Sequence, residues 1–249
     1  MQTLRIAAWS GPRNISTAMM RSWENRADTT VCDEPFYAHY LKKTDLDHPG
    51  KQQVLAHHET DWKKVVKTLT AKCDTSIHYQ KHMAHHLLSH ISRDWIAEVT
   101  NIFLIRDPRE MLVSLIKQIP NPTIEDTGLP QQLQLFESVK TLNKNPIVLD
   151  AKDVLLKPKE MLNALCKKLN IPFYNEMITW PAGKRKTDGI WAKHWYKAVE
   201  SSTGFEPWRP KKEVVPAALE TICLKCIDIY KELAKHKMTL QEREDATKI

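Results

Sequence analysis

The sequence lacks the features of a membrane-bound or secreted protein. It contains no run of about 18 or more apolar residues, which is what a membrane-spanning helix requires. Its first residues also differ from a secretory signal, because Arg5 and Trp9 interrupt an apolar segment that is already too short. We therefore expect a cytoplasmic protein without membrane contact.

Cysteine is scarce and shows no paired arrangement. Five cysteines, an odd number, are scattered along the chain, which argues against a disulfide framework and for a reducing compartment. At 249 residues and 42% hydrophobic content, one large core is more plausible than two. We expect a single α/β domain over residues 1–237 and a charged, frayed tail over 238–249. The net charge of +7 suits an anionic ligand, either a nucleotide or a nucleic acid.

The sequence also lacks a Walker A motif, although it has a loop of similar placement. Residues 4–9 are an apolar run of strand length, Gly11-Pro12 breaks it, and Ser16 or Thr17 can cap a helix to about residue 26. Such a loop directs backbone N–H groups and a helix dipole at one point, where phosphate or sulfate can bind. Arg13 adds a planar cation that can hold two oxygens. The alternative is an ordinary strand–turn–helix with a surface arginine, and these residues alone do not decide between them.

Short apolar runs alternate with helical patterns along the whole chain. This alternation predicts a three-layer α/β/α fold around a mostly parallel sheet, with ligands at the carboxyl ends of its strands. Residues 35–58 are expected to form a polar loop, 121–130 a proline-rich loop, and 180–209 a basic segment with four tryptophans. We expect strands near 4–9, 29–32, 75–80, 101–106 and 146–150, and helices near 16–26, 59–72, 84–93, 108–119, 133–142, 157–169 and 216–237.

A second anion site is suggested where the clearest strand ends. Arg106 leaves residues 101–106, and Ser114 lies about two turns into the following helix, which Asp107 caps and Pro108 begins. A guanidinium and a hydroxyl together can hold a phosphate. The alternative is that Arg106 pairs with Asp107 or Glu110 and that Ser114 only packs.

Together these segments resemble the sulfotransferases, whose fold is P-loop NTPase-like. Pro12-Arg-Asn-Ile-Ser-Thr17 resembles the family's 5′-phosphosulfate loop, and Phe103-Leu-Ile-Arg-Asp-Pro-Arg-Glu-Met-Leu-Val-Ser-Leu115 closely resembles its 3′-phosphate strand and helix. Residues 150–158 with 165–172, and more faintly Arg185-Lys-Thr-Asp-Gly-Ile-Trp191, are similar to later family segments. Residues 9–14 and 33–40 are similar to an uncharacterised sulfotransferase-like branch.

The resemblance implies transfer of a sulfuryl group from 3′-phosphoadenosine 5′-phosphosulfate (PAPS) to a hydroxyl or amine of a small molecule, leaving adenosine 3′,5′-bisphosphate (PAP). It implies no metal and no nucleic-acid partner, and it leaves the oligomeric state open. Two departures from the family pattern bear on PAPS affinity, since Ile15 and Thr187 stand where the family has glycine. The residues implied to bind the nucleotide are Arg13, Asn14, Ile15, Ser16, Thr17, Arg106, Ser114, Arg185 and Lys186.

Sulfuryl transfer also needs a base for the acceptor's proton and a cation for the leaving phosphate. Arg13 would supply the cation. The resemblance offers Glu34, after the second strand, as the first candidate for the base, and His82, at the end of the third strand, as the second. Each also has an ordinary explanation, a loop salt bridge for Glu34 and a half-exposed helix start for His82.

Two features and two other functions stay open beside this hypothesis. His82, His86 and His90 have helical spacing that would suit a metal, but no zinc motif accompanies them, so solvated histidines are favoured. Cys223 and Cys226 lie within an apolar helical pattern, which favours core packing.

A P-loop phosphotransferase is disfavoured because the Walker lysine is missing. A non-catalytic nucleotide- or nucleic-acid-binding protein remains possible, because aromatic and basic residues over 180–209 could stack on bases.

Overall fold

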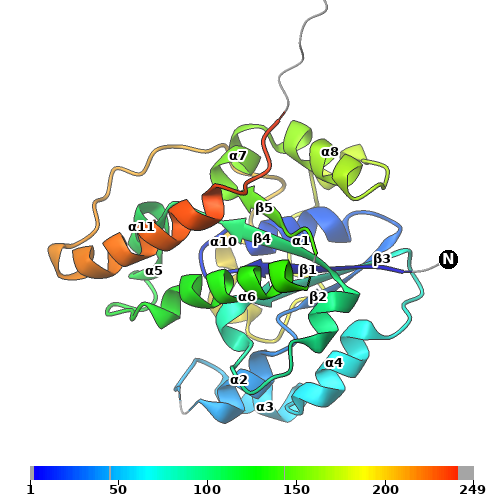
Figure 1. The fold of residues 1–249 in the computed structure, drawn as a ribbon, viewed down its shortest axis with the longest axis horizontal. Helices are drawn as coiled ribbons and strands as arrows, with labels where there is room; N and C mark the ends of the chain where they lie inside the picture. Colours follow the sequence, from blue (N-terminus) through cyan, green and yellow to red (C-terminus); the bar gives the residue numbers. More distant parts are fainter. Residues whose placement is uncertain (1–2, 45, 143, 241–249) are drawn as a thin grey trace, which may run out of the picture.

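A five-stranded parallel sheet forms the centre of the molecule (Figure 1). The computed structural model describes residues 3–44, 46–142 and 144–240. The strand order is β2-β3-β1-β4-β5. The chain first adds β2 and β3 on one side of β1 and then β4 and β5 on the other, so the order of the strands reverses at β1. In open α/β sheets a ligand crevice forms at such a reversal, outside the carboxyl ends of the strands. The strands are β1 Leu4–Ser10, β2 Thr29–Asp33, β3 Ile77–Met83, β4 Thr100–Ile105 and β5 Ile147–Asp150.

Helices cover both faces of this sheet, as the sequence predicts. The helices are α1 Ser16–Glu24, α2 Tyr37–Lys43, α3 Lys51–His57, α4 Trp62–Thr70, α5 Pro108–Leu115, α6 Leu129–Thr141, α7 Ala151–Leu156, α8 Pro158–Lys168, α9 Ala192–Trp195, α10 Lys197–Glu200 and α11 Glu220–Ala234. Short 3₁₀ helices lie at Ala84–His86, Asp94–Glu98, Glu125–Thr127, Asn175–Met177 and Ala217–Leu219. The three-layer α/β/α prediction is therefore confirmed.

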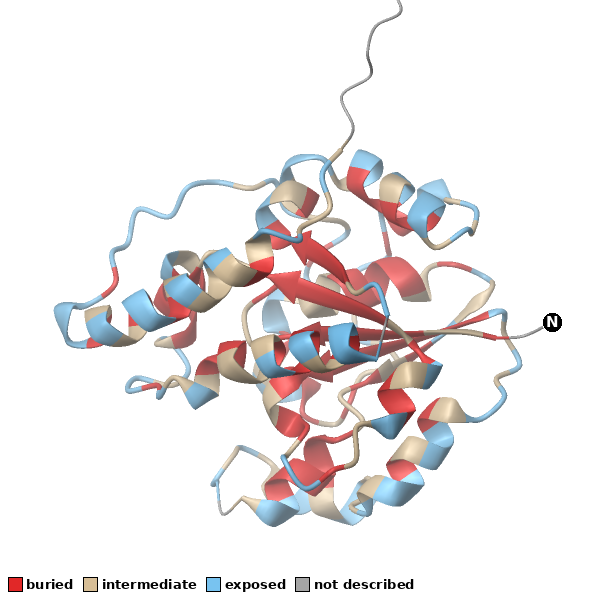
Figure 2. Ribbon diagram, in the orientation of Figure 1, coloured by how far each residue is buried: buried red, intermediate tan, exposed pale blue. Residues whose placement is uncertain are grey.

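Figure 2 shows buried strands surrounded by helices that are buried in some parts and exposed in others. Side-chain alternation along the strands divides the core into two layers. Ile6 and Ala8 of β1 pack with α1, α7 and α8, whereas Ala7 and Trp9 pack with α4, α6 and α11. Because both faces are covered, strands such as β4 and β5 read as nearly continuous apolar runs, which is why they could be found in the sequence. The Trp9 indole donates to buried Asn101 Oδ1 at 2.9 Å, which pairs two polar groups within this layer.

The polar loop expected over residues 35–58 is wrong, because it contains α2 and α3. Tyr37, Leu41 and Val54 are buried, and they pack against Trp191 in a cluster of their own. Helices this short depend on tertiary packing more than on local propensity. Their apolar positions have a partner only after residues 190–199 fold over them, so a local pattern cannot reveal them.

The histidine-rich helix expected over residues 84–93 is also wrong. Strand β3 continues to Met83, and a single 3₁₀ turn at Ala84–His86 follows it. The Arg93 guanidinium donates to the carbonyl groups of Leu87, Leu88 and Ile91 at 2.6 to 3.0 Å. These bonds satisfy backbone acceptors that a helix would otherwise have satisfied, while Leu87 and Ile91 enter the core.

The C-terminal segment follows the outer strand β5. Met238 N donates to Val148 O at 2.8 Å, and Met238 and Leu240 pack on the core. Most of the tail expected from residue 238 onward, residues 241–249, lies outside the described residues. Among the described residues, no helix is both long and apolar enough to span a membrane.

Candidate active site

The loop between β1 and α1 has an unusual backbone. Arg13 and Ile15 adopt left-handed conformations, with φ of 62° and 54°. The cap position of α1 is Ile15, not Ser16 or Thr17 as expected, and no side chain caps the helix. The first N–H groups of a helix have no partner within it, so without a side-chain cap they stay available to a ligand. The expected cap is therefore wrong, and the first turn of α1 has no side-chain cap.

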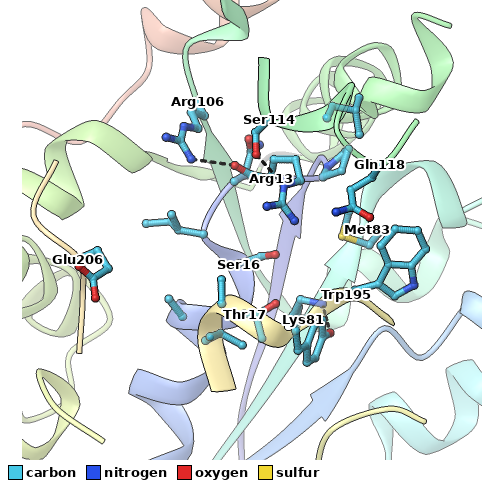
Figure 3. Close-up of a pocket in the computed structure, with 18 of the residues that line it drawn as sticks. Arg13, Ser16, Thr17, Lys81, Met83, Arg106, Ser114, Gln118, Trp195 and Glu206 are labelled. Atoms are coloured by element: carbon cyan, nitrogen blue, oxygen red, sulfur yellow. Dashed lines mark hydrogen bonds between the residues drawn. The ribbon is translucent and has the colours of Figure 1, made fainter. Parts of the chain in front are cut away.

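A cavity of about 580 Å³ opens at the carboxyl ends of the strands, directly over this loop (Figure 3). Its size is that of a small-molecule site. Its walls come from residues 12–18, from the ends of β2 and β3, from α5 and from residues 195–211. Figure 3 shows Arg13, Ser16 and Thr17 in the middle, with Arg106, Ser114 and Glu206 toward one end and Lys81, Met83 and Trp195 toward the other. We call the end with Arg106, Ser114 and Glu206 the nucleotide end, and the end with Lys81, Met83 and Trp195 the acceptor end.

Cations concentrate at the nucleotide end. Arg13 Nε donates to Ser114 Oγ at 2.9 Å, and Arg106 donates to the Arg13 carbonyl at 3.0 Å. Burial, together with the nearby Arg106, lowers the pKa of Arg13. Arg106 also pairs with Glu110 at 3.0 Å, which is the alternative that the sequence left open, yet it still lines the cavity. Two guanidiniums held this close favour an anion between them.

Residues 204–211 complete this end, and none of them was among the site residues expected from the sequence. The Trp208 indole donates to Glu110 Oε1 at 2.9 Å, and Lys152 lies 4.3 Å from the centre of its ring. Lys211 lines the cavity, and burial and then Arg106 lower its pKa. The excess of tryptophan and basic residues over 180–209 was the available signal, but the resemblance assigned it to Arg185 and Lys186.

Arg185 and Lys186 lie elsewhere. Neither lines the cavity, because Arg185 donates to Pro181 O at 2.7 Å and faces Glu24 at 3.7 Å, while Lys186 is exposed. Thr187, in the place of a family glycine, donates to Glu24. These contacts attach the segment to α1 rather than to the cavity.

A buried charge network forms the floor of the acceptor end. Lys81 donates to Asp33 Oδ1 at 2.9 Å and to Glu34 Oε1, and the Tyr196 hydroxyl joins all three. Burial alone would lower the pKa of Lys81, but Asp33 and Glu34 raise it. Burial raises the pKa of Glu34 in spite of the opposing Lys81 charge. Glu34 has a left-handed backbone, with φ of 42°, which turns its side chain to the cavity wall.

His82 does not reach the cavity. Strand alternation places Lys81 and Met83 on the cavity side and His82 on the opposite face, where it stacks on Trp9 with 4.4 Å between ring centres. Burial, followed by the charges of His78 and Lys81, lowers its pKa to about 3. Of the two base candidates, only Glu34 lines the cavity together with residues 12–18. Among the described residues, no group of three or more His, Cys, Asp or Glu side chains could hold a metal ion.

The chain is similar to two proteins of Arabidopsis thaliana over most of its length. The chain is 33% identical over 232 residues to branched-chain-amino-acid aminotransferase-like protein 1 of Arabidopsis thaliana. It is 33% identical over 239 residues to branched-chain-amino-acid aminotransferase-like protein 2 of the same organism. These matches cover 93% and 94% of the chain but only 42% and 43% of those proteins, so the chain spans less than half of their length.

Solved structures resemble the fold at low sequence identity. The sulfotransferase domain of the Synechococcus PCC 7002 olefin synthase matches with a TM-score of 0.59 and 13% identity, over 93% of this chain and 96% of that one. A sulfotransferase from Alicyclobacillus acidocaldarius matches with a TM-score of 0.55 and 8% identity, over 96% and 98%. The family model described as "Sulfotransferase domain" matches residues 4–233. The chain therefore belongs to the sulfotransferase domain family.

Proposed function

We propose that this protein transfers a sulfuryl group from PAPS to a hydroxyl or amine of a small molecule and releases PAP. The observation that carries this proposal is a single cavity that joins two anion-binding elements to a buried carboxylate. Residues 13–17 and α1 form one anion site, and Arg106 with Ser114 and Lys211 form the second. A nucleotide with phosphates at both its 5′ and 3′ positions matches this pair of sites.

The loop conformation supports this fit in spite of Ile15. A β-branched residue rarely adopts positive φ, and the left-handed conformation costs roughly 1–2 kcal/mol for a residue with a side chain. Ile15 nevertheless has φ of 54°, so the loop keeps a backbone that glycine would adopt freely. Strained backbone of this kind is concentrated at functional sites.

The protein's own groups then have distinct roles. Arg13 and the start of α1 stabilise negative charge on the departing phosphate, as preorganised donors do in transition states. Glu34 accepts the acceptor's proton through Oε2, which accepts no hydrogen bond from any described residue, whereas Oε1 is occupied by Lys81 and Tyr196. A base works best when its pKa is close to the operating pH, and burial moves the Glu34 pKa in that direction.

The direct test is a thermal-shift panel with PAP, PAPS, ATP, GTP and single-stranded DNA. A ligand that binds only the folded state raises the melting temperature by an amount that grows with the logarithm of its concentration relative to its Kd. We expect PAP and PAPS to stabilise the protein more than ATP or GTP do. Equal or larger shifts with ATP or GTP would favour a phosphotransferase, and a shift with DNA alone would favour a nucleic-acid-binding protein. PAP release from PAPS in the presence of acceptors then establishes turnover.

A further inference from the structure

Aromatic rings line the acceptor end of the cavity. His86 lies between Tyr37 and Tyr40, with ring centres 4.7 Å apart in both pairs and interplanar angles of 14° and 29°. His48 accompanies them, with its Nδ1 at 2.9 Å from the Tyr37 hydroxyl and its ring centre 6.3 Å from that of Trp195. All five side chains line the cavity, and Figure 3 shows Trp195 facing it across from Arg13.

The histidines at this end are neutral, so they add no positive charge. Burial lowers the pKa of His48, and it lowers the pKa of His86 well below the ordinary value. Burial, with His48, lowers the pKa of His85 to about 4. His86 Nδ1 is buried and has no hydrogen-bond partner among the described residues, and it faces Glu34 Oε2 at 3.8 Å.

Carboxylates outnumber cations at the acceptor end. Among the described residues that line it, Lys81 is the one cation, and Asp33 and Glu34 both pair with it. Asp126 adds a further negative charge: after burial, its charge is the second cause that raises the pKa of Tyr40, and it partly opposes the lowering of the His48 pKa by burial. Its Oδ2 accepts from the Thr123 N–H at 2.8 Å and from the Thr123 hydroxyl at 2.9 Å, while its Oδ1 accepts no hydrogen bond from any described residue.

The two ends of the cavity therefore have opposite polarity. Arg106 and Lys211 make the nucleotide end positive, and Arg13 adds a positive charge in the middle of the cavity, as a bisphosphate requires. A carboxylate beside electron-rich aromatic faces has the opposite preference, because ring faces and carboxylates both attract cations. An anionic acceptor would meet Asp126 and Glu34 with no free cation among the described residues of that end.

From this arrangement we infer that the acceptor is a small organic cation, with its charged group between Asp126 and the rings of Tyr40, His48 and Trp195 and its nucleophile at Glu34. The inference rests on the proposed sulfuryl transfer, and the charged group is distinct from the atom that reacts. In the step, a bond forms between the acceptor oxygen or nitrogen and sulfur, and the bond from sulfur to the phosphate oxygen breaks. The electron pair of the broken bond stays on the phosphate of PAP, and the acceptor's proton passes to Glu34.

The test compares ligands that differ only in charge, titrated into the PAP-loaded protein by calorimetry. One series is tyramine, 4-propylphenol and 3-(4-hydroxyphenyl)propanoate, and a second pair is choline and 3,3-dimethyl-1-butanol. In one of the two ligand sets, we expect the cation to bind at least about tenfold more tightly than its neutral partner. A desolvated cation over aromatic faces gains enough binding free energy for this difference. Neutral or anionic members that bind as tightly as the cation, or no cation binding in either set, would overturn the inference.

Asp126→Asn identifies the residue responsible. The amide keeps an oxygen for the Thr123 contacts and removes the charge, so the preference for cation over neutral partner should fall about fivefold or more while PAP affinity stays unchanged. Glu125→Gln is the matched control, because Glu125 is exposed on the same 3₁₀ turn and does not line the cavity. An unchanged preference in Asp126→Asn contradicts the assignment.

The same titrations without PAP separate this inference from the proposed function. If PAP does not bind but cations still do, with the Asp126 dependence, the cation site is real and the proposed function is wrong. If PAP binds and the cations show no preference, the nucleotide assignment holds and the inference about the acceptor fails.

Discussion

Replacing Lys81 with methionine should destabilise the protein mainly through Glu34. Lys81 is 1% exposed, and its removal leaves two buried carboxylates. Asp33 would keep two donors, the Tyr196 hydroxyl at 2.8 Å and the Gly189 N–H at 3.0 Å. Glu34 would keep only the shared Tyr196 hydroxyl at 3.3 Å among the described residues. Breaking a buried pair by removing one partner costs about 3–5 kcal/mol, so we expect a loss of that order near pH 8.

The loss should shrink as the pH falls. Burial already raises the pKa of Glu34, and removing the Lys81 charge raises it further. A carboxyl group whose pKa is higher in the folded state contributes stability that is present below its unfolded pKa and lost as the pH rises through its folded pKa. Lys81→Met should therefore lie closer to wild type at pH 5 than at pH 8.

Urea unfolding followed by tryptophan fluorescence at both pH values measures these differences. Adding Glu34→Gln to Lys81→Met should recover part of the loss at pH 8, because the double variant buries one carboxylate fewer. A loss below about 1 kcal/mol, or one that is equal at both pH values, would refute the reasoning, since it would show that Glu34 is not held by Lys81.

Two predictions concern the reaction. Arg106→Ala should weaken PAP binding about tenfold or more by calorimetry, because it removes a cation from the nucleotide end; unchanged affinity in a folded variant would show that the 3′-phosphate binds elsewhere. Glu34→Gln should keep PAP affinity and lower turnover roughly 10²- to 10⁴-fold, the usual effect of losing a positioned base; near-normal rates of PAP release would exclude Glu34 as that base.

The sequence predicts those parts of the fold whose pattern is complete within a short segment. Strands β1, β4 and β5 are mainly apolar runs, because helices cover both of their faces, whereas β3 carries several polar side chains and has a weaker pattern. The helix that Asp107 caps and Pro108 begins is confirmed by the Asp107 bond to Arg109 N at 2.8 Å. Helices α2 and α3 were missed because their buried faces meet Trp191, far along the chain. A pattern that depends on a distant partner carries little local signal.

In the candidate site, too, the sequence reveals the residues that lie within one short segment and misses those whose position depends on distant contacts. Residues 12–18, Arg106 and Ser114 belong to contiguous strand-to-helix segments, and the structure brings them to one cavity. Trp208 and Lys211 come from an extended segment whose position depends on Glu110 and Lys152, so no local spacing marks them. Strand parity explains His82, because residues one apart on a strand face opposite sides of the sheet. Lys81 faces the cavity and His82 the core.

The position of His82 leads to a prediction about acid stability. Its ring stacks on Trp9, its Nε2 lies 3.2 Å from Gln80 Oε1, and burial lowers its pKa to about 3. The unfolded chain binds a proton at this histidine below about pH 6.5 and the folded chain does not, so stability falls as the pH drops toward 3. Between pH 7 and 5 this one group should lower the free energy of unfolding by about 2 kcal/mol. The unfolded chain takes up the proton over about 1.5 pH units, and each unit is worth about 1.36 kcal/mol. His82→Phe keeps a ring against Trp9 and cannot bind the proton, so urea unfolding should show its free energy falling less than that of wild type over this interval. Equal falls would mean that His82 already titrates normally in the folded protein, and the same variant should keep its PAP affinity because His82 does not line the cavity.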